Sequence, residues 1–509
     1  MLRNDENKQA MSPKAEKPDQ FAKIEAVLRR HPGVRAAKVS RENFGPDELI
    51  VYVVPHDDYV RVALTDTDEE RKRIQKWRKT FDLMQMGKEA AAAEPGFNIA
   101  GWNSSYTRQP IPAQEMREWV ENTVAEIISL RPQDLLEIGC GTGLLLLRIA
   151  PRCKRYVATD FAPAVLAKLR KQMEEMGSSW DGVDLLERTA DNFEGVAECM
   201  FDTVVINSVT QHFPNVSYLT KVMDGAIQAL KPGGKIFIGD VRSLPLLETY
   251  AASVELYQAR PDMEFAELRE RVALRVRQQE QLVISPAFFL ALAERNPRVS
   301  GIEIRLKRGR SDNELTRFRY DVVLHAGGGR NVSTELAWLN WTAKGKGIEN
   351  IRQMLNDEKP ESVAITSIRN ARVEKDIKTL EKISHLGVGG TAGELRKELE
   401  ATDTDGINPE DLYATGEELG YRVELSWASC RPSGSYDAVL SRTDTPAEKK
   451  DPVKWPQLST TGKLPAKYTN VPGQNVFRER LVQHLLSYCE EHLPEEMVPH
   501  ALVLVDSLP

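Results

Sequence analysis

Two acidic residues flank a glycine-rich turn in the first third of the 509-residue chain. Residues 135–143 read LLEIGCGTG, an apolar run that passes through Glu137 and then breaks into three alternating glycines, Gly139, Gly141 and Gly143. Asp160 closes a second apolar segment downstream. Glycines in such a loop let the backbone turn sharply and approach a ligand closely. The two carboxylates can accept hydrogen bonds from an amino-acid ammonium and from ribose hydroxyls, so the pattern predicts a site for a nucleoside that carries both.

The glycine spacing distinguishes between two kinds of nucleoside site. The loop reads G-x-G-x-G, whereas dinucleotide sites use G-x-G-x-x-G. Strand, loop and acidic residue in this order predict a site for S-adenosylmethionine, with S-adenosylhomocysteine as product. Glu137 is expected to face the ammonium and Asp160 the ribose. The alternative for Glu137 is a capping role at the start of the next helix.

Polar residues also follow the third and fourth predicted strands. Asp191 could contact the adenine or serve as a turn residue. Asn207 and Ser208 could line the space for either the cosubstrate or the acceptor. His212 is the main catalytic candidate: an α-amino group titrates near pH ~8, so a neutral imidazole could help to expose its lone pair. The alternative is that His212 packs under the lid or forms a hydrogen bond with a backbone carbonyl.

Three further residues are candidates outside the glycine loop. Gln211 is expected to orient the acceptor. Glu314 could hold a substrate ammonium or act as the base, or it could form an ion pair with Arg317 or Arg319. Tyr106 could close over the cosubstrate or be an ordinary packed aromatic. Methyl transfer from a sulfonium is an in-line displacement that depends on positioning and water exclusion, so no metal is expected.

Composition excludes several classes of protein. The chain is too long for one core, and no uncharged apolar run approaches the ~20 residues of a membrane helix. Residues 1–19 are polar and are expected to form a disordered tail rather than a signal. A net charge of −7 without a basic stripe argues against nucleic acid. Five scattered cysteines suggest reduced thiols and a cytoplasmic location.

Alternating strands and helices predict the framework that positions these residues. The pattern implies a mainly parallel sheet covered on both faces. Its seven strands are expected at 134–138, 155–159, 183–187, 201–207, 235–239, 302–306 and 319–324, the last pair antiparallel. A helical insertion over 241–300 is expected to be a lid at the carboxyl ends of the strands.

Composition and periodicity divide the rest of the chain. The predicted parts are a small α+β fragment (20–60), the domain with the glycine loop (61–329), an accessory α/β subdomain (330–442), a linker (443–467) and a second small fragment (468–509).

The two end fragments together resemble the C-terminal subdomain of a nonribosomal peptide synthetase adenylation domain. FAKIEAVLRRHPGV is similar to the start of that subdomain, and LPEEMVP to its late motif LPxYMVP, with Glu496 at the tyrosine position. The inserted part resembles the methyltransferase domains that interrupt such subdomains. Its matching segments are GWNSSY, IPAQEMREWVENTV, LLEIGCGTGLLL, VVINSVTQHFP and NELTRFRYDVVL.

The resemblance implies a fold, a reaction and partners. The fold is α/β, a class I Rossmann-like seven-stranded methyltransferase with an accessory subdomain, inserted in the small adenylation subdomain. The reaction is N-methylation of the α-amine of an aminoacyl thioester on a phosphopantetheinyl carrier domain. An adenylation core would act in cis or in trans. The adenylating lysine of the family would follow Pro509, so adenylation by this chain is not expected.

Other interpretations remain open at the level of the sequence. The methyl group could go to a side-chain oxygen or sulfur, or the chain could be an inactive docking domain. His212 occupies a position where the family usually has tyrosine, so its role is not inherited from the resemblance. The amino acid, the general base, the oligomeric state and the role of 331–442 are not specified.

Overall fold

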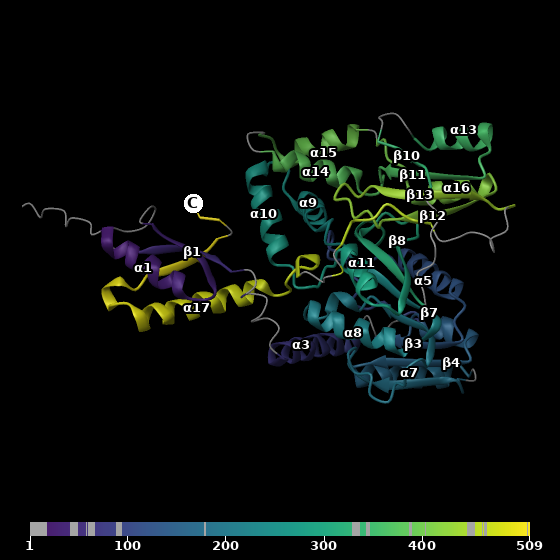
Figure 1. The fold of residues 1–509 in the computed structure, drawn as a ribbon, viewed down its shortest axis with the longest axis horizontal. Helices are drawn as coiled ribbons and strands as arrows, with labels where there is room; N and C mark the ends of the chain where they lie inside the picture. Colours follow the sequence, from purple (N-terminus) through teal and green to yellow (C-terminus); the bar gives the residue numbers. More distant parts are fainter. Residues whose placement is uncertain are drawn as a thin grey trace, which may run out of the picture. The chain divides into compact units, whose positions relative to one another are not determined.

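The chain divides into two compact units, residues 1–66 with 473–509 and residues 67–472 (Figure 1). The computed structural model describes residues 18–40, 49–56, 59, 67–87, 94–177, 180–327, 336–342, 347–385, 389–402, 404–444, 453–460, 462, 466–505 and 507–508. Most of the tail predicted at 1–19, and much of the linker predicted at 443–467, lies outside the described residues.

The first unit joins the two ends of the chain in one sheet. Its elements are α1 (Pro18–Arg30), β1 (Val34–Ser40), β2 (Ile50–Pro55), α17 (Gln474–His492), the short η5 (Glu495–Met497) and β14 (Ala501–Leu504). The strand order is β1-β2-β14, with β1 antiparallel and β14 parallel to β2. Ile24 and Leu28 of α1 share a core with Leu481 and Leu485 of α17. Neither fragment could bury its apolar face alone, so each completes the other.

The second unit is built on a seven-stranded sheet with the order β5-β4-β3-β6-β7-β9-β8. The strands are β3 (Asp134–Ile138), β4 (Arg155–Asp160), β5 (Val183–Glu187), β6 (Phe201–Asn207), β7 (Leu230–Arg242), β8 (Val299–Leu306) and β9 (Arg319–Ala326). All neighbours are parallel except β9, which is antiparallel to both β7 and β8. The class I methyltransferase fold and the antiparallel last pair are confirmed.

Alternate residues of the central strands enter different cores. Leu136 and Val204 belong to one hydrophobic cluster, whereas Leu135, Val205 and Phe237 belong to another. This alternation follows from the period of two in a strand that is buried on both faces. The covering helices are α5 (Ala113–Ser129), α6 (Leu146–Ile149) with η1 (Ala150–Arg152), α7 (Pro163–Glu175) and α8 (Val216–Ala229).

The insertion between β7 and β8 is helical, as the sequence predicts, and packs against both the main sheet and the accessory subdomain. It contains α9 (Leu247–Gln258), α10 (Phe265–Arg277) and α11 (Pro286–Arg295). Phe265 and Leu268 of α10 share a cluster with Ile383 and Leu395 of the accessory helices. The insertion is followed, after β8, by the short α12 (Glu314–Phe318).

The accessory subdomain has its own four-stranded sheet, in the order β10-β11-β13-β12. Its elements are β10 (Trp338–Asn340), α13 (Ile348–Glu358), β11 (Ser362–Ile368), α14 (Glu374–Ser384), α15 (Ala392–Ala401), α16 (Pro409–Glu418), β12 (Tyr421–Ser426) and β13 (Tyr436–Arg442), and η4 (Ala466–Tyr468) follows. The Trp427 amide donates to the Ile304 carbonyl oxygen at 3.0 Å, which attaches this sheet beside β8.

Helix α3 (Thr67–Met86) precedes the main sheet and lies beside α8 and α7 (Figure 1). The Asn215 side-chain amide at the start of α8 donates to Glu70 Oε1 at 2.8 Å. Lys168 of α7 donates to the Gln85 carbonyl oxygen. These contacts hold α3 across the carboxyl ends of the parallel strands.

Among the helices that the structure describes, none combines the length and apolar character needed to cross a bilayer. Within the same residues, no group of three or more His, Cys, Asp or Glu side chains is placed to bind a metal ion.

Candidate functional site

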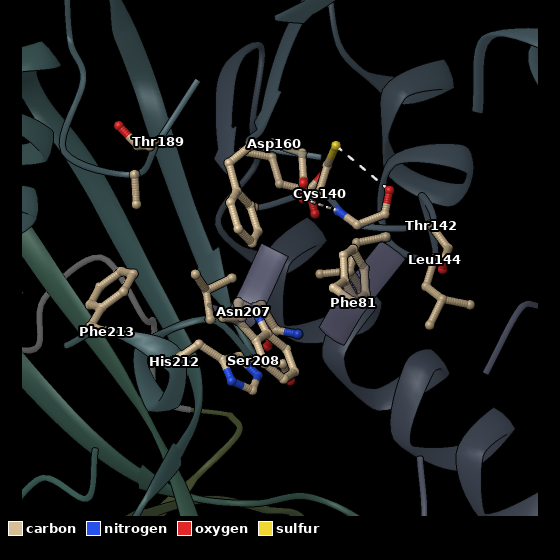
Figure 2. Close-up of a pocket in the computed structure, with 18 of the residues that line it drawn as sticks. Phe81, Cys140, Thr142, Leu144, Asp160, Thr189, Asn207, Ser208, His212 and Phe213 are labelled. Carbon is tan, nitrogen blue, oxygen red and sulfur yellow. Dashed lines mark hydrogen bonds between the residues drawn. The ribbon is translucent and has the colours of Figure 1, made fainter. Parts of the chain in front are cut away.

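A pocket lies where β3, β4 and β6 end, between the glycine loop and α3 (Figure 2). Seven of the residues singled out from the sequence line it: Glu137, Gly139, Gly141, Asp160, Asn207, Ser208 and His212. Parallel strands bring their carboxyl ends to one edge of a sheet, so residues that follow different strands converge there.

The glycine loop needs glycine because of both its backbone conformation and its neighbours. Gly139 and Gly141 have φ of +77° and +51°. A Cβ on Gly139 would lie 2.5 Å from a methyl carbon of Val209, which itself lines the pocket. Gly143 is outside the lining, and a Cβ there would lie 2.5 Å from Leu169 of α7. Gly143 therefore permits close packing behind the loop rather than ligand contact.

Asp160 connects the end of β4 to the glycine loop. One carboxylate oxygen accepts from the Gly141 amide at 2.9 Å, and the other accepts from the Ala162 amide at 2.9 Å. The side chain is only 4% exposed, and burial raises its pKa. Asp160 thus holds the glycine loop and the residue that precedes α7, and it also lines the pocket.

Glu137 offers a second carboxylate in the pocket wall. The Tyr156 hydroxyl donates to Oε2 at 2.8 Å, and the residue is 3% exposed. Burial raises the pKa of Glu137 to about 7, although the hydrogen bond from Tyr156 acts in the opposite direction. A cationic ligand group would favour the ionised form of this carboxyl.

One face of α3 forms the opposite wall of the pocket. Ile74, Trp77, Phe81 and Gln85 line it, at spacings of three and four residues that place them on one side of a helix. This wall was not predicted from the sequence, although the apolar stripe is present among the charged residues. The wall comes from α3 instead of the lid expected at 241–300, since no residue of that insertion lines the pocket.

His212 lies in the short helix η2 (Thr210–His212), where it stacks on Trp77. The ring centroids are 3.7 Å apart and the planes differ by 10°. Burial, together with the positive charges of Arg319 and Arg242, lowers the pKa of His212 to about 3. The imidazole is therefore neutral at physiological pH, and it can accept a hydrogen bond but holds a proton poorly.

Asn207 and Ser208 end β6 at the pocket. Asn207 Oδ1 is buried and has no hydrogen-bond partner within the described residues. Space for it exists because residue 239 is glycine, where a Cβ would lie 2.1 Å from this oxygen. The Ser208 hydroxyl donates a hydrogen bond to Asp240 Oδ2 at 2.5 Å. Asn207 lines the pocket, and the side-chain oxygen that has no partner within the described residues can accept a hydrogen bond from a ligand N–H group.

Two of the candidates that lie outside the pocket lining bind to the loop around residue 105 or to α9. Glu314 accepts from the Ser105 amide at 2.7 Å and from the Ser105 hydroxyl at 2.9 Å. Tyr106 bonds Ser253 through its hydroxyl at 3.0 Å, and the guanidinium of Arg317 lies 5.1 Å from its ring centroid. Both side chains hold the loop around residue 105 against α9 and α12, so their hydrogen-bonding groups are engaged within the protein.

Gln211 and Asp191 are near the pocket without lining it. The Gln211 side-chain amide donates to the Ser208 carbonyl oxygen at 2.8 Å, so it supports the turn after β6 instead of meeting an acceptor directly. Asp191 follows the lining residues Thr189 and Ala190. Together with burial, its carboxylate raises the pKa of Tyr218, another residue of the wall.

Two tryptophans complete the wall and were not singled out from the sequence. Trp102, in the GWNSSY segment, contacts Trp119 of α5 with ring centroids 4.8 Å apart. Trp119 Nε1 donates to Asp240 Oδ1 at 3.2 Å. The GWNSSY motif thus supplies a pocket residue, although it is Trp102 and not Tyr106.

Comparison with known proteins assigns the sheet domain. Residues 136–236 match the family model described as a methyltransferase domain. The chain is 37% identical over 505 residues to chondramide synthase cmdD of Chondromyces crocatus, covering 96% of this chain and 13% of that protein. It is 31% identical over 490 residues to a probable non-canonical nonribosomal peptide synthetase, CymA, of Salinispora arenicola, covering 96% of this chain and 6% of that protein. The chain thus spans a small part of these relatives.

The search of solved structures matched methyltransferases. One is the N-methyltransferase NodS from Bradyrhizobium japonicum in complex with S-adenosylhomocysteine, with 12% identity and a TM-score of 0.29 over 49% of this chain and 97% of that one. Another is CalS10, an amino pentose methyltransferase from Micromonospora echinaspora with bound S-adenosylmethionine, with 26% identity and a TM-score of 0.20 over 23% and 48%.

Proposed function

Because the chain carries an S-adenosylmethionine-dependent methyltransferase domain of the kind associated with nonribosomal peptide synthetases, we propose that it methylates the α-amine of an aminoacyl thioester on a carrier domain. The observation that carries this proposal is the combination of a glycine-loop pocket with similarity to synthetases over 96% of the chain. If the chain were a methyltransferase of another class, the similarity to synthetases in the unit formed by residues 1–66 and 473–509 would have no explanation.

The residues of the pocket divide into a cosubstrate side and an acceptor side. When bound, S-adenosylmethionine supplies an electrophilic methyl group on a sulfonium. We assign Gly139 and Gly141 to close backbone contact, Asp160 to the ribose hydroxyls and Glu137 to the ammonium. Two carboxylates, of which one is buried beside a tyrosine hydroxyl, match a cationic nucleoside in charge and in hydrogen-bond polarity.

The acceptor side lies at the end of β6. Asn207, Ser208 and His212 present hydrogen-bond acceptors there, and His212 is neutral because its pKa is lowered. An amine that approaches as the neutral form can donate N–H bonds to these groups while its lone pair points at the methyl carbon. The aromatic wall of Trp77, Phe81 and Phe213 excludes water from the reacting groups.

The partners proposed for this reaction follow from the same setting. A carrier domain would present the aminoacyl group as a thioester on its phosphopantetheine arm. An adenylation core, in cis or in trans, would select and load the amino acid. We propose that the unit formed by residues 1–66 and 473–509 serves as the C-terminal subdomain of that core.

The test uses a carrier domain loaded with a panel of aminoacyl groups. Incubation with the full chain and cosubstrate is expected to raise the intact mass of the carrier by one methylene unit. The variant D160A is the matched negative control because it removes both backbone-bonded carboxylate oxygens at the cosubstrate side. If no carrier in the panel gains mass while the chain binds cosubstrate, the proposed acceptor is wrong. Fragmentation of a methylated product distinguishes the α-nitrogen from a side-chain oxygen or sulfur.

A further inference from the structure

A buried carboxylate lies directly behind the acceptor side of the pocket. Asp240, near the end of β7, has no exposed surface. Its Oδ2 is bonded to the Ser208 hydroxyl at 2.5 Å and its Oδ1 accepts from Trp119 Nε1 at 3.2 Å. Ser208 and Trp119 both line the pocket, whereas Asp240 does not. One carboxylate therefore holds two pocket residues from two different elements.

The backbone on both sides of this hydrogen bond is held in an unfavourable conformation. Ser208 has φ of +56° and Asp240 has φ of +64°. A left-handed backbone is unfavourable for residues other than glycine, and such positions concentrate at functional sites. The Ser208 amide donates to the Gly239 carbonyl oxygen at 3.1 Å, and Gln211 bonds the Ser208 carbonyl oxygen. The hydroxyl, the amide and the carbonyl oxygen of Ser208 thus each have a partner, and together these hydrogen bonds orient its side chain.

Charge keeps Asp240 ionised. Arg319 donates to Oδ2, and the Asp240 amide donates to Asp321, which pairs with Lys307 at 3.0 Å. These two cations hold the pKa of Asp240 below its usual range despite complete burial. An ionised carboxylate can only accept hydrogen bonds. The Ser208 hydroxyl proton is therefore committed to Asp240, and the lone pairs of Ser208 Oγ remain for a partner in the pocket.

We propose that Ser208 is a catalytic residue that accepts a hydrogen bond from the acceptor nitrogen, and that Asp240 is the positioning residue that orients its hydroxyl. This inference rests on the proposed function in taking the acceptor to be an amine. In the step, the nitrogen lone pair forms the new N–C bond, the C–S bond breaks and its electron pair stays on sulfur. The nitrogen becomes cationic and its N–H bond to Ser208 strengthens. The surplus proton then leaves the product ammonium for water.

The test needs no acceptor substrate. Sinefungin is a cosubstrate analogue with a primary ammonium in place of the transferable methyl, whereas S-adenosylhomocysteine has nothing there. Calorimetry of the full chain with each ligand gives two dissociation constants, and their ratio measures the preference for sinefungin over S-adenosylhomocysteine. The native chain is expected to bind sinefungin at least about tenfold more tightly, since hydrogen bonds to charged groups are worth more than neutral ones. In the S208A variant the preference for sinefungin is expected to fall by about tenfold, while the affinity for S-adenosylhomocysteine stays the same.

Two further variants keep the test decisive. D240N is expected to change the ratio in the same direction, and S208A alone decides the question if D240N fails to fold. S367A is the matched control, because Ser367 also has a left-handed backbone, with φ of +65°, and lies in the accessory sheet, which contributes nothing to the pocket lining. If the ratio is unchanged in S208A, including the case in which both ligands lose affinity by the same factor, the proposal is overturned. A failed carrier assay would refute the proposed acceptor without altering this ratio.

Discussion

Trp77 and His212 stack on each other in the pocket lining, with ring centroids 3.7 Å apart and an angle of 10° between their planes. One residue comes from α3 and the other from the turn after β6. The stack therefore joins the wall that covers the pocket to the edge of the sheet where the reaction is proposed. It also removes water from the imidazole, which is the largest cause of the low pKa of His212.

Removing this stack is expected to weaken ligand binding and to raise the pKa of His212. In W77A the imidazole gains solvent, so its pKa should rise from about 3 toward the ordinary value of 6.5. Affinity for S-adenosylhomocysteine should fall by about tenfold because an aromatic wall is lost. NMR titration of the histidine and calorimetry measure the two effects. W338A, in the accessory sheet, is the control, and a His212 pKa that stays near 3 in W77A would contradict the account.

The same pKa predicts how His212 affects stability. The native state binds fewer protons at His212 than the unfolded state does between about pH 3 and 6.5, so stability should rise with pH across this window. The stability that comes from keeping His212 neutral is complete above pH 6.5 and is lost as the pH falls toward about 3. Denaturant unfolding at several pH values should show a shallower pH dependence in H212N than in the native chain. An identical slope in both would mean that His212 titrates normally in the folded protein.

Cosubstrate binding is expected to depend on pH through Glu137. Its pKa of about 7 means that ionisation is incomplete near neutrality in the free protein. A ligand ammonium needs the ionised form, so affinity should increase by about tenfold between pH 6 and pH 8. Calorimetry over this range should show the increase in the native chain and not in E137Q. In Y156F the midpoint should move to higher pH, because the hydrogen bond that lowers the pKa is removed.

A pair of glycine substitutions separates backbone strain from loss of the site. Gly139 and Gly177 both have positive φ, +77° and +65°, so alanine should cost about 1–3 kcal/mol of stability at either position. A Cβ at position 139 would meet Val209 at 2.5 Å, whereas position 177 has nothing within 4 Å. G139A is expected to lose at least about tenfold in cosubstrate affinity, and G177A none. Equal affinities in the two variants would exclude the loop from the site.

Glu314 is expected to act on the fold and not as a base. In E314Q the Ser105 amide and hydroxyl lose a charged acceptor, which should cost about 1–3 kcal/mol of unfolding free energy. The pH profile of methyl transfer should keep its shape. Loss of one limb of that profile, with a rate decrease of about 100-fold, would instead identify Glu314 as the general base.

The sequence predicts the sheet well for a physical reason. Buried parallel strands must be apolar on both faces, so segments such as VVI in β6 are recognisable without any contact information. Glu137, Asp160 and Asn207 could also be placed, because residues at the carboxyl ends of such strands meet at one edge. The predicted strands at 134–138, 183–187 and 201–207 coincide with β3, β5 and β6.

The rest of the site depends on tertiary packing that a local pattern does not reveal. Helix α3 is rich in charged residues, and only its position over the strand ends makes Trp77 and Phe81 part of a pocket. Tyr106 and Glu314 lie in motifs that suggested ligand contact, yet their polar atoms bond Ser253 and Ser105. The Ser208–Asp240 hydrogen bond joins the ends of two neighbouring strands, and nothing in either segment alone indicates it.

The most direct test of the central claim is to locate the transferred methyl group. Cosubstrate with a ¹³C-labelled methyl, the full chain and a carrier loaded with an amino acid are incubated, and the released aminoacyl product is examined by NMR and fragmentation. One labelled methyl on the α-nitrogen is expected with the native chain, and none with D160A. A label on a side-chain oxygen or sulfur, or no label on any loaded carrier although the chain binds cosubstrate, would contradict this claim.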